Sequence, residues 1–325
     1  MKIKLKFLAL AAIGLASCNA GFKNGDGGLV YKIVDDKGGP TIQEGDFITV
    51  NVVAKTDADS VLFSTYEIGQ STNLIMRKPP FKGDVLAGLK YLAEGDSAVI
   101  KTNIDSAAAK GMHKPTFKGK YIVYDLKVEK VIPKGKLSDV VFRGRVDAYM
   151  KTQADQMRKE EPLKIKKYLA DNNLKVTTTA SGLNYLISKE GAGPKIMTGD
   201  TAVVYYTGKF LNGKIFDTNV KSEAQKAKIP MNPMNPYKPI RFPVGVSGMI
   251  QGWNEALLLL NKGSKATLVL PSSLAYGEKG MQQIPGFTPL AFDVELVDII
   301  HPDPNAPKPA APGPAVIKLD KPAKK

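Results

Sequence analysis

The sequence has few of the side chains that enzymes use for covalent or metal-dependent chemistry. Among its 325 residues there are one cysteine and two histidines, His113 and His301. A single cysteine cannot form an internal disulfide, and two scattered histidines are too few for a metal site or a catalytic triad. These counts argue against disulfides, a histidine-ligated metal site and a histidine-dependent triad, and we expect no cofactor.

The one cysteine ends an N-terminus that reads as a secretory signal. Three lysines precede an apolar run from Phe7 to Leu15 that is too short to span a bilayer permanently. The tetrapeptide LASC (15–18) resembles the bacterial lipobox, which implies cleavage before Cys18 and lipidation of its thiol. The alternative is an ordinary signal with a chance cysteine.

The expected N-terminal layout is a signal peptide at 1–17 and a lipidated tether at 18–27. A lipid anchor holds a protein to a membrane without spanning it. Asn19 follows the cysteine, and the lack of an aspartate there favours the outer over the inner membrane. The face from which the protein points, periplasm or cell surface, is left open.

The formal net charge is +15, and both ends of the chain contribute to it. A basic surface suits anionic lipid, cell-wall polymer or acidic client proteins, although a merely solvated surface is the commonest reason for such charge. Nucleic acid is not an expected partner, because the sequence shows no recognition motif and the predicted address is outside the cytoplasm.

Period-two patterns predict two sheet-forming regions, 28–133 and 177–301. In the first, Ile48, Val50 and Val52 alternate with polar residues, which is typical of an antiparallel strand packed on one face. In the second, Trp253, Ala256, Leu257 and Leu260 have the i, i+3, i+4, i+7 spacing of a short helix with one buried side.

The segment 134–176 between these regions is predicted to be a helical connector. Pro162 predicts a break, with the proline as first residue of a second helix. Whether the connector pairs two chains into a homodimer is left open. The Pro-, Ala- and Lys-rich end, 302–325, is predicted to be a disordered tail.

The two sheet-forming regions also look like copies of one another. Gly45-Asp46 matches Gly199-Asp200 with an offset of 154, and Phe63 matches Phe216 with an offset of 153. Later matches, such as Tyr124 with Phe292, have an offset of 168. One insertion at 221–239 in the second copy accounts for the change, which favours duplication over chance.

The second copy closely resembles the FKBP-type peptidyl-prolyl cis-trans isomerases. The resemblance rests on GDTAVVYYTGKFLNGKIFD (199–217), MIQGWNEAL (249–257), LAYG (274–277) and AFDVELVDI (291–299). It covers about 100 residues in the family's order and implies an α+β fold, in which an antiparallel half-barrel sheet wraps around one short helix. We expect two such FKBP-like units joined by the connector.

The resemblance implies a pocket for a proline ring. Its expected residues are Tyr206, Phe216, Asp217, Phe242, Met249, Ile250, Trp253, Tyr276, Ile284 and Phe292. Trp253 would be the floor, while Asp217, Tyr276 and the Ile250 N–H would supply polar contacts. Core packing is the ordinary explanation for any one of the apolar residues, and only the set favours a site. Gln283 departs from the family pattern, which has an aliphatic residue there.

The first copy lacks the floor and both polar side chains in this alignment. Val52 replaces Tyr206, Ser64 replaces Asp217, Leu74 replaces Phe242, Val85 replaces Trp253 and Ala108 replaces Tyr276. We therefore predict that the first unit has the fold without the activity.

Three functions are compatible with these observations. The favoured one is a lipid-anchored isomerase that acts on proline-containing, unfolded or partly folded chains outside the cytoplasm and also has chaperone function. The second is a non-catalytic module that holds such clients. The third is a structural lipoprotein that contacts envelope polymer through its basic surface.

Overall fold

The computed structural model describes residues 21–109, 111, 117, 119–229, 237–245 and 248–302. The predicted signal peptide, Cys18 and the tail from residue 303 onward lie outside these residues. No helix in the described part of the chain has the length and apolar character needed to cross a membrane.

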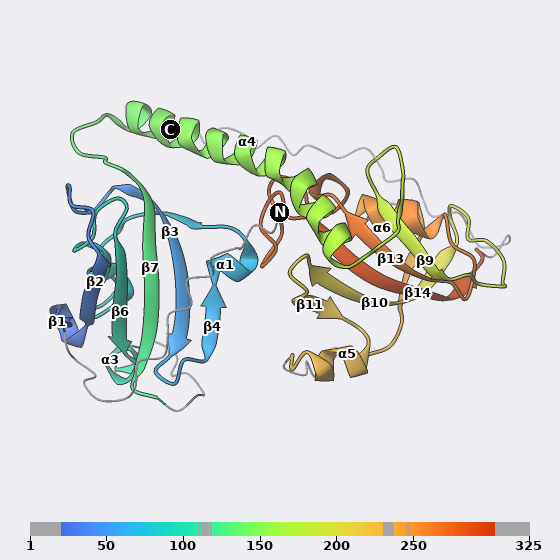
Figure 1. Cartoon of the computed structure of the whole chain (residues 1–325), viewed down its shortest axis with the longest axis horizontal. Helices are drawn as coiled ribbons and strands as arrows, with labels where there is room; N and C mark the ends of the chain where they lie inside the picture. Colours follow the sequence, from blue (N-terminus) through green and yellow to red (C-terminus); the bar gives the residue numbers. More distant parts are fainter. Residues whose placement is uncertain are drawn as a thin grey trace, which may run out of the picture. The chain divides into compact units, whose positions relative to one another are not determined.

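The chain divides into two compact units, Met1–Asp155 and Gln156–Lys325. Each contains a seven-stranded sheet whose strands all pair antiparallel (Figure 1). Short helices accompany each sheet, so the predicted α+β class is confirmed. Both sheets follow the half-barrel plan expected from the resemblance.

The first sheet has the strand order β1-β2-β6-β7-β3-β4, with β5 also paired to β3. Its strands are β1 (Lys23–Asn24), β2 (Val30–Asp35), β3 (Phe47–Thr56), β4 (Val61–Ser64), β5 (Thr72–Ile75), β6 (Ser97–Asn103) and β7 (Tyr121–Ile132). Its short helices are η1 (Asp26–Gly28), α1 (Thr65–Ile68), α2 (Val85–Leu89) and α3 (Ile104–Ala108).

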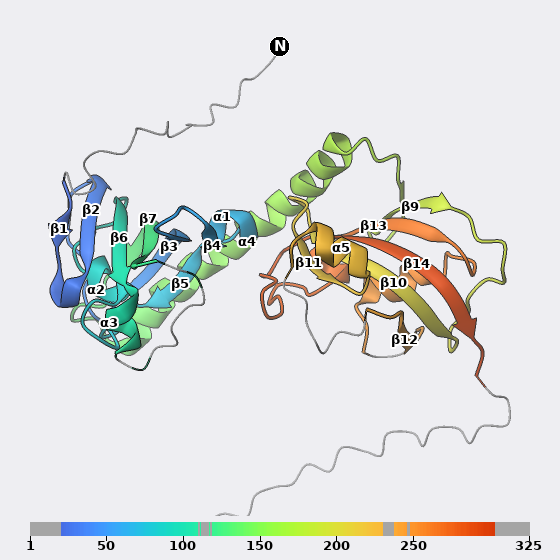
Figure 2. The same ribbon diagram turned by 90° about the horizontal axis from the view of Figure 1, so that it is seen from below.

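The second sheet has the matching order β11-β10-β14-β13-β9-β8, with β12 also paired to β10 (Figure 2). Its strands are β8 (Thr177–Thr178), β9 (Asn184–Lys189), β10 (Thr201–Phe210), β11 (Ile215–Thr218), β12 (Ile240–Pro243), β13 (Lys265–Leu270) and β14 (Leu290–Ile300). Its short helices are α5 (Lys221–Lys226), α6 (Gln251–Leu257) and η2 (Ser272–Leu274).

Helix α6 forms the centre of the second unit's core. Trp253, Ala256 and Leu257 lie on α6 and Leu260 lies just after its end, and all four are buried. Gly252 permits this packing, because a Cβ there would lie 2.6 Å from a methyl group of Leu270. The helix is therefore pressed against the inner face of the sheet.

Equivalent hydrogen bonds in the two units support the predicted duplication. The Asn219 side chain accepts a hydrogen bond from the Tyr206 N–H at 2.7 Å. In the first unit the Thr65 hydroxyl accepts one from the Val52 N–H at 2.9 Å. Both pairs keep the offset of 154, so the two units share a backbone framework as well as sequence matches.

The strand register corrects one detail of the sequence alignment. Gly208 lies opposite Asp217, and Ala54 lies opposite Phe63. Because both pairs precede the same bulge, Phe63 is the equivalent of Asp217, and the matching of Phe63 to Phe216 was wrong by one residue. Ser64 is accordingly the equivalent of Thr218.

The connector is one helix, α4 (Asp139–Asp171), and the predicted break at Pro162 was wrong. Proline lacks the N–H that would bond to the preceding turn, which normally ends or bends a helix. Here contacts hold α4 on both sides of Pro162: Glu161 bonds to Ser272, and Ile165 packs against Val269 and Ala291. Tertiary packing overrides the local preference.

Candidate functional site

The second unit has a cluster of aromatic rings around the indole of Trp253. The ring centroids of Tyr206, Phe292 and Phe242 lie 5.2, 5.4 and 5.7 Å from it, the first two edge-on. Phe216 in turn packs edge-on against Phe292 at 5.8 Å. Such geometries suit the quadrupoles of aromatic rings and make a rigid apolar surface.

Trp253 forms the base of this cluster, with only 2% of its surface exposed. Its Nε1 is the one buried side-chain nitrogen or oxygen in the described part of the chain that has no hydrogen-bond partner. An unpaired buried donor costs about 1–3 kcal/mol. The indole is thus held by packing rather than by polar contacts.

The site's one carboxylate lies at the edge of the aromatic cluster. The Tyr206 hydroxyl, on β10, donates a hydrogen bond to Oδ2 of Asp217, on β11, at 2.5 Å. Asp217 is exposed to solvent, whereas Tyr206 is half-buried. The bond fixes a negative charge beside the rings without burying it.

Two tyrosines of the cluster have raised pKa values. Burial raises the pKa of Tyr206, and the hydrogen bond and negative charge of Asp217 raise it further. Burial also raises the pKa of Tyr276, with a smaller contribution from the charge of Asp217. Both phenols therefore stay protonated, and able to donate hydrogen bonds, at neutral pH.

A buried asparagine outside the predicted set positions Tyr206 and Asp217. The Asn219 side chain accepts from the Tyr206 N–H and donates to the carbonyl oxygens of Val204 and Lys238, both at 3.0 Å. It therefore fastens β10 to the end of β11 and to the chain before β12. The sequence offered one signal for it, a polar residue two positions after Asp217.

A glycine outside the predicted set makes room for two of the rings. A Cβ on Gly208 would lie 2.6 Å from the Phe216 ring and 2.9 Å from the Phe292 ring. Contacts this short do not occur in real structures, so any side chain here would displace an aromatic ring.

The start of α6 supplies Met249 and Ile250, which are both half-buried against the cluster. Ile250 is the N-cap residue of α6, and its carbonyl accepts from the Trp253 N–H at 3.1 Å. The Ile250 N–H makes no backbone hydrogen bond with any described residue. This is usual for the first N–H groups of a helix, which have no partner within the helix.

The loop between β13 and β14 supplies Tyr276 and Ile284. Ile284 is buried in the same core as Trp253, and Tyr276 packs against that core while half-exposed. Gln283, the residue that departs from the family pattern, is exposed and donates to the carbonyl of Phe216 at 3.2 Å. Its amide thus fastens this loop to β11 beside Asp217.

All ten predicted residues therefore lie together. Four are buried in the core and five pack against it, while Asp217 joins through its bond to Tyr206. The sequence did not identify Asn219 or Gly208, whose effect on the site is indirect.

The first unit has no such cluster among its described residues. Val52 and Val85 occupy positions equivalent to Tyr206 and Trp253, and both only pack against the core. Phe63 stands where the second unit has Asp217. The first unit therefore lacks counterparts of the tryptophan, the neighbouring tyrosine and the carboxylate of the second unit.

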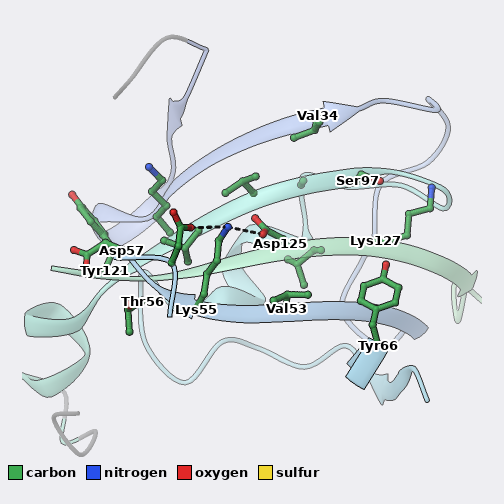
Figure 3. Close-up of a pocket in the computed structure, with 16 residues that line it drawn as sticks. Val34, Val53, Lys55, Thr56, Asp57, Tyr66, Ser97, Tyr121, Asp125 and Lys127 are labelled. Atoms are coloured by element: carbon green, nitrogen blue, oxygen red, sulfur yellow. Dashed lines mark ion pairs between the residues drawn. The ribbon is translucent and has the colours of Figure 1, made fainter. Parts of the chain in front are cut away.

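The first unit does have a separate cavity of about 580 Å³ on the outer face of its sheet (Figure 3). Lys55 lies in it and pairs with Asp125 at 3.0 Å and with Asp59 at 3.1 Å. Lys209 and Asp293 form the equivalent pair in the second unit. This ion pair therefore belongs to the shared framework rather than to a counterpart of the aromatic cluster.

Comparison with known proteins agrees with this geometry. The family model described as FKBP-type peptidyl-prolyl cis-trans isomerase matches residues 193–297. The chain is 35% identical over 167 residues to the FKBP-type 22 kDa peptidyl-prolyl cis-trans isomerase of Escherichia coli K12, covering 50% of this chain and 73% of that protein. It is 32% identical over 215 residues to a probable FKBP-type isomerase of Haemophilus influenzae, covering 65% of this chain and 79% of that protein.

Among solved structures, the crystal structure of FkpA from Escherichia coli is similar, with 32% identity and a TM-score of 0.39 over 52% of this chain and 76% of that one. The sequence relatives show that the chain belongs to the FKBP-type peptidyl-prolyl cis-trans isomerase family. It is an isomerase of Xaa-Pro peptide bonds.

Proposed function

We propose that the aromatic cluster of the second unit is the catalytic site and that its substrates are proline-containing, unfolded or partly folded chains outside the cytoplasm. The observation that carries this is the arrangement around Trp253. Rigid rings form an apolar base, Asp217 is held beside it by its bond to Tyr206, and the half-exposed Tyr276 and Ile250 pack against the same core.

The chemistry follows from the amide bond. Resonance sets a rotation barrier of roughly 18–20 kcal/mol, whereas the cis and trans forms of an Xaa-Pro bond differ by only about 0.5–1 kcal/mol. The twisted transition state loses resonance and much of its charge separation. An apolar surface therefore favours it over the planar, dipolar ground state that water stabilises.

Each group has a distinct role in this proposal. The proline ring packs against the rings above Trp253. The Ile250 N–H donates to one substrate carbonyl, and the Tyr276 hydroxyl donates to another. Asp217 lies near the rotating carbonyl, oriented by Tyr206. No bond to the substrate forms or breaks, so the rate gain comes from binding the twisted amide more tightly.

The test is an isomerisation assay on the full chain with an Xaa-Pro peptide. Replacing both Asp217→Ala and Tyr276→Ala is expected to lower kcat/KM by about 100-fold or more, because two groups that bind the transition state are lost. A pocket-blocking macrolide should inhibit the unchanged chain. Phe63→Ala, at the first unit's equivalent position, is the matched control and should leave the rate unchanged. An undiminished rate in the double variant would refute the proposed site.

We further propose that Cys18 is lipidated and that the protein is anchored in the cell envelope, at the outer membrane. The support is the LASC motif at 15–18 after a signal-like segment. Cys18→Ser should abolish labelling with a fatty-acid analogue and shift the protein from the membrane to the soluble envelope fraction. Unchanged labelling would exclude this anchor.

A second function, client holding by the first unit, is favoured by exposed apolar side chains on and beside β4. This strand lies at the edge of its sheet. Val61, Leu62, Phe63 and Tyr66 are between 42% and 61% exposed. Edge strands with exposed apolar residues readily bind other chains. We propose that this edge holds apolar segments of unfolded clients.

A homodimer through α4 remains a proposal as well. Val140 and Val141, near the start of the helix, are exposed apolar residues that a second copy would cover. Light scattering of the full chain and of a variant with both valines replaced by serine distinguishes the states. A monomer in both samples would exclude this dimer.

A further inference from the structure

A buried carboxylate on α4 is not accounted for by the isomerase mechanism. Glu161 is 8% exposed and accepts two hydrogen bonds from Ser272. One comes from the Ser272 hydroxyl at 2.8 Å, and the other comes from its backbone N–H. Buried carboxylates are costly unless they are fully hydrogen-bonded, so this contact is a specific one.

Ser272 begins the loop that carries Tyr276. It is the first residue of η2, and the Ala275 and Gly277 N–H groups both bond to its carbonyl, at 2.9 and 2.8 Å. Glu161 therefore holds the first turn of this loop, four residues before the proposed substrate-binding hydroxyl.

Arg158, one turn earlier on α4, contacts the far side of the same loop. It donates a hydrogen bond to Glu278 at 2.5 Å, and its guanidinium carbon lies 5.4 Å from the centre of the Phe287 ring. Glu278 follows Tyr276 by two residues. The helix thus contacts the loop both before and after Tyr276.

The first unit shows that this arrangement is specific to the second. Its equivalent loop begins with α3, which Asn103 caps by accepting from the Ser106 N–H at 3.0 Å. In the second unit the cap position is Pro271, which makes no such side-chain bond. The first unit's counterpart of the Ser272 N–H is that of Ile104, which donates to the carbonyl of Lys120 at 3.0 Å, so in the second unit a side chain on α4 takes the place of that backbone acceptor.

We propose that Glu161, assisted by Arg158, is a positioning residue of the isomerase: it holds the 271–288 loop so that the Tyr276 hydroxyl stays over the aromatic cluster. The proposal rests on the function assigned above. It makes α4 part of the catalytic framework. Loss of the contacts from Glu161 and Arg158 lets the loop move. Binding of the transition state then weakens because the Tyr276 hydroxyl is misplaced.

The test is a double-mutant cycle in the full chain, read by kcat/KM on an Xaa-Pro peptide. Glu161→Ala is expected to lower kcat/KM about tenfold in the natural background and less than about twofold when Tyr276→Phe is already present. Glu160→Ala, at the neighbouring half-exposed glutamate, is the matched control and should leave kcat/KM unchanged in both backgrounds. Equal losses in both backgrounds, or no loss in the first, would overturn the proposal.

A milder variant covers the case in which Glu161→Ala does not fold. Ser272→Ala removes only the hydroxyl donor and is expected to lower kcat/KM about threefold, again only when Tyr276 is present. An unchanged rate in a folded Ser272→Ala chain would overturn the proposal too. If the protein with its natural sequence had no isomerase activity, the proposed function itself would be refuted.

Discussion

The hydroxyl of Tyr206 donates a hydrogen bond to Asp217 across two neighbouring strands. The tyrosine is half-buried and packs on Trp253, whereas the carboxylate it holds is exposed. Burial and the charge of Asp217 both raise the pKa of Tyr206, so the phenol keeps its proton. The pair thus presents an oriented negative charge at the edge of an apolar surface, and its two members can be separated by mutation.

Replacing Tyr206→Phe should affect activity more than stability. The ring and its packing remain, but Asp217 loses its fixed orientation, so we expect kcat/KM to fall about tenfold. Because Asp217 is exposed and water can replace the lost donor, the free energy of unfolding should fall by only about 1 kcal/mol. Peptide isomerisation and urea unfolding measure the two effects. Tyr205→Phe, the adjacent tyrosine, is the control, and a stability loss without a rate loss would contradict the prediction.

The raised pKa of Tyr206 also predicts how stability depends on alkaline pH. An unfolded tyrosine ionises near pH 10, at about its model value. Since the folded protein binds the phenolic proton more tightly, this stabilisation is complete below about pH 10 and is lost as the pH rises further. Between pH 8 and about pH 10.5, the urea midpoint should therefore fall more in the natural protein than in the Tyr206→Phe variant. Equal falls would mean that Tyr206 does not titrate as described.

Gly208→Ala should damage both folding and catalysis. The new methyl group would overlap the Phe216 and Phe292 rings, and overpacking of this kind costs about 1–3 kcal/mol. Gly144→Ala should instead raise stability. Gly144 lies on α4 with open space around its Cβ position, so an alanine there should stabilise the helix by about 0.5–1 kcal/mol. Thermal unfolding of both variants, with isomerase assays, provides the comparison. A neutral Gly208→Ala would show that the rings have room to move.

Client holding should depend on the β4 edge and not on the aromatic cluster. Phe63→Ser combined with Tyr66→Ser is expected to reduce suppression of aggregation of a heat-treated model enzyme at least about twofold, because exposed apolar area is lost. Isomerase activity should be unchanged. Met197→Ser, at an exposed apolar residue of the second unit, is the control. Equal suppression by all three proteins would exclude this edge as the binding surface.

Much of the fold could be predicted because short-range spacing of apolar residues indicates helices and strands. The Trp253 to Leu260 spacing identified α6, and the alternation from Ile48 to Val52 identified β3. The ten residues predicted from the resemblance lie together in the structure. These signals are local or depend on motifs whose order along the chain is informative.

The errors came where a local signal competed with tertiary contacts. Phe63 was matched to Phe216 because they are the same residue type, but β4 is too short and too exposed to show an alternation that fixes its register. Pro162 predicted a break that packing of Ile165 prevents. The hydrogen bond between Ser272 and Glu161 joins residues 111 positions apart, and no local sequence pattern predicts it.

The sequence contains a single tryptophan, and it lies at the base of the second unit's aromatic cluster. All indole fluorescence of this protein therefore comes from that cluster. A titration of indole fluorescence with peptide or macrolide would report on that unit alone, because the first unit contains no tryptophan, and no engineered label is required.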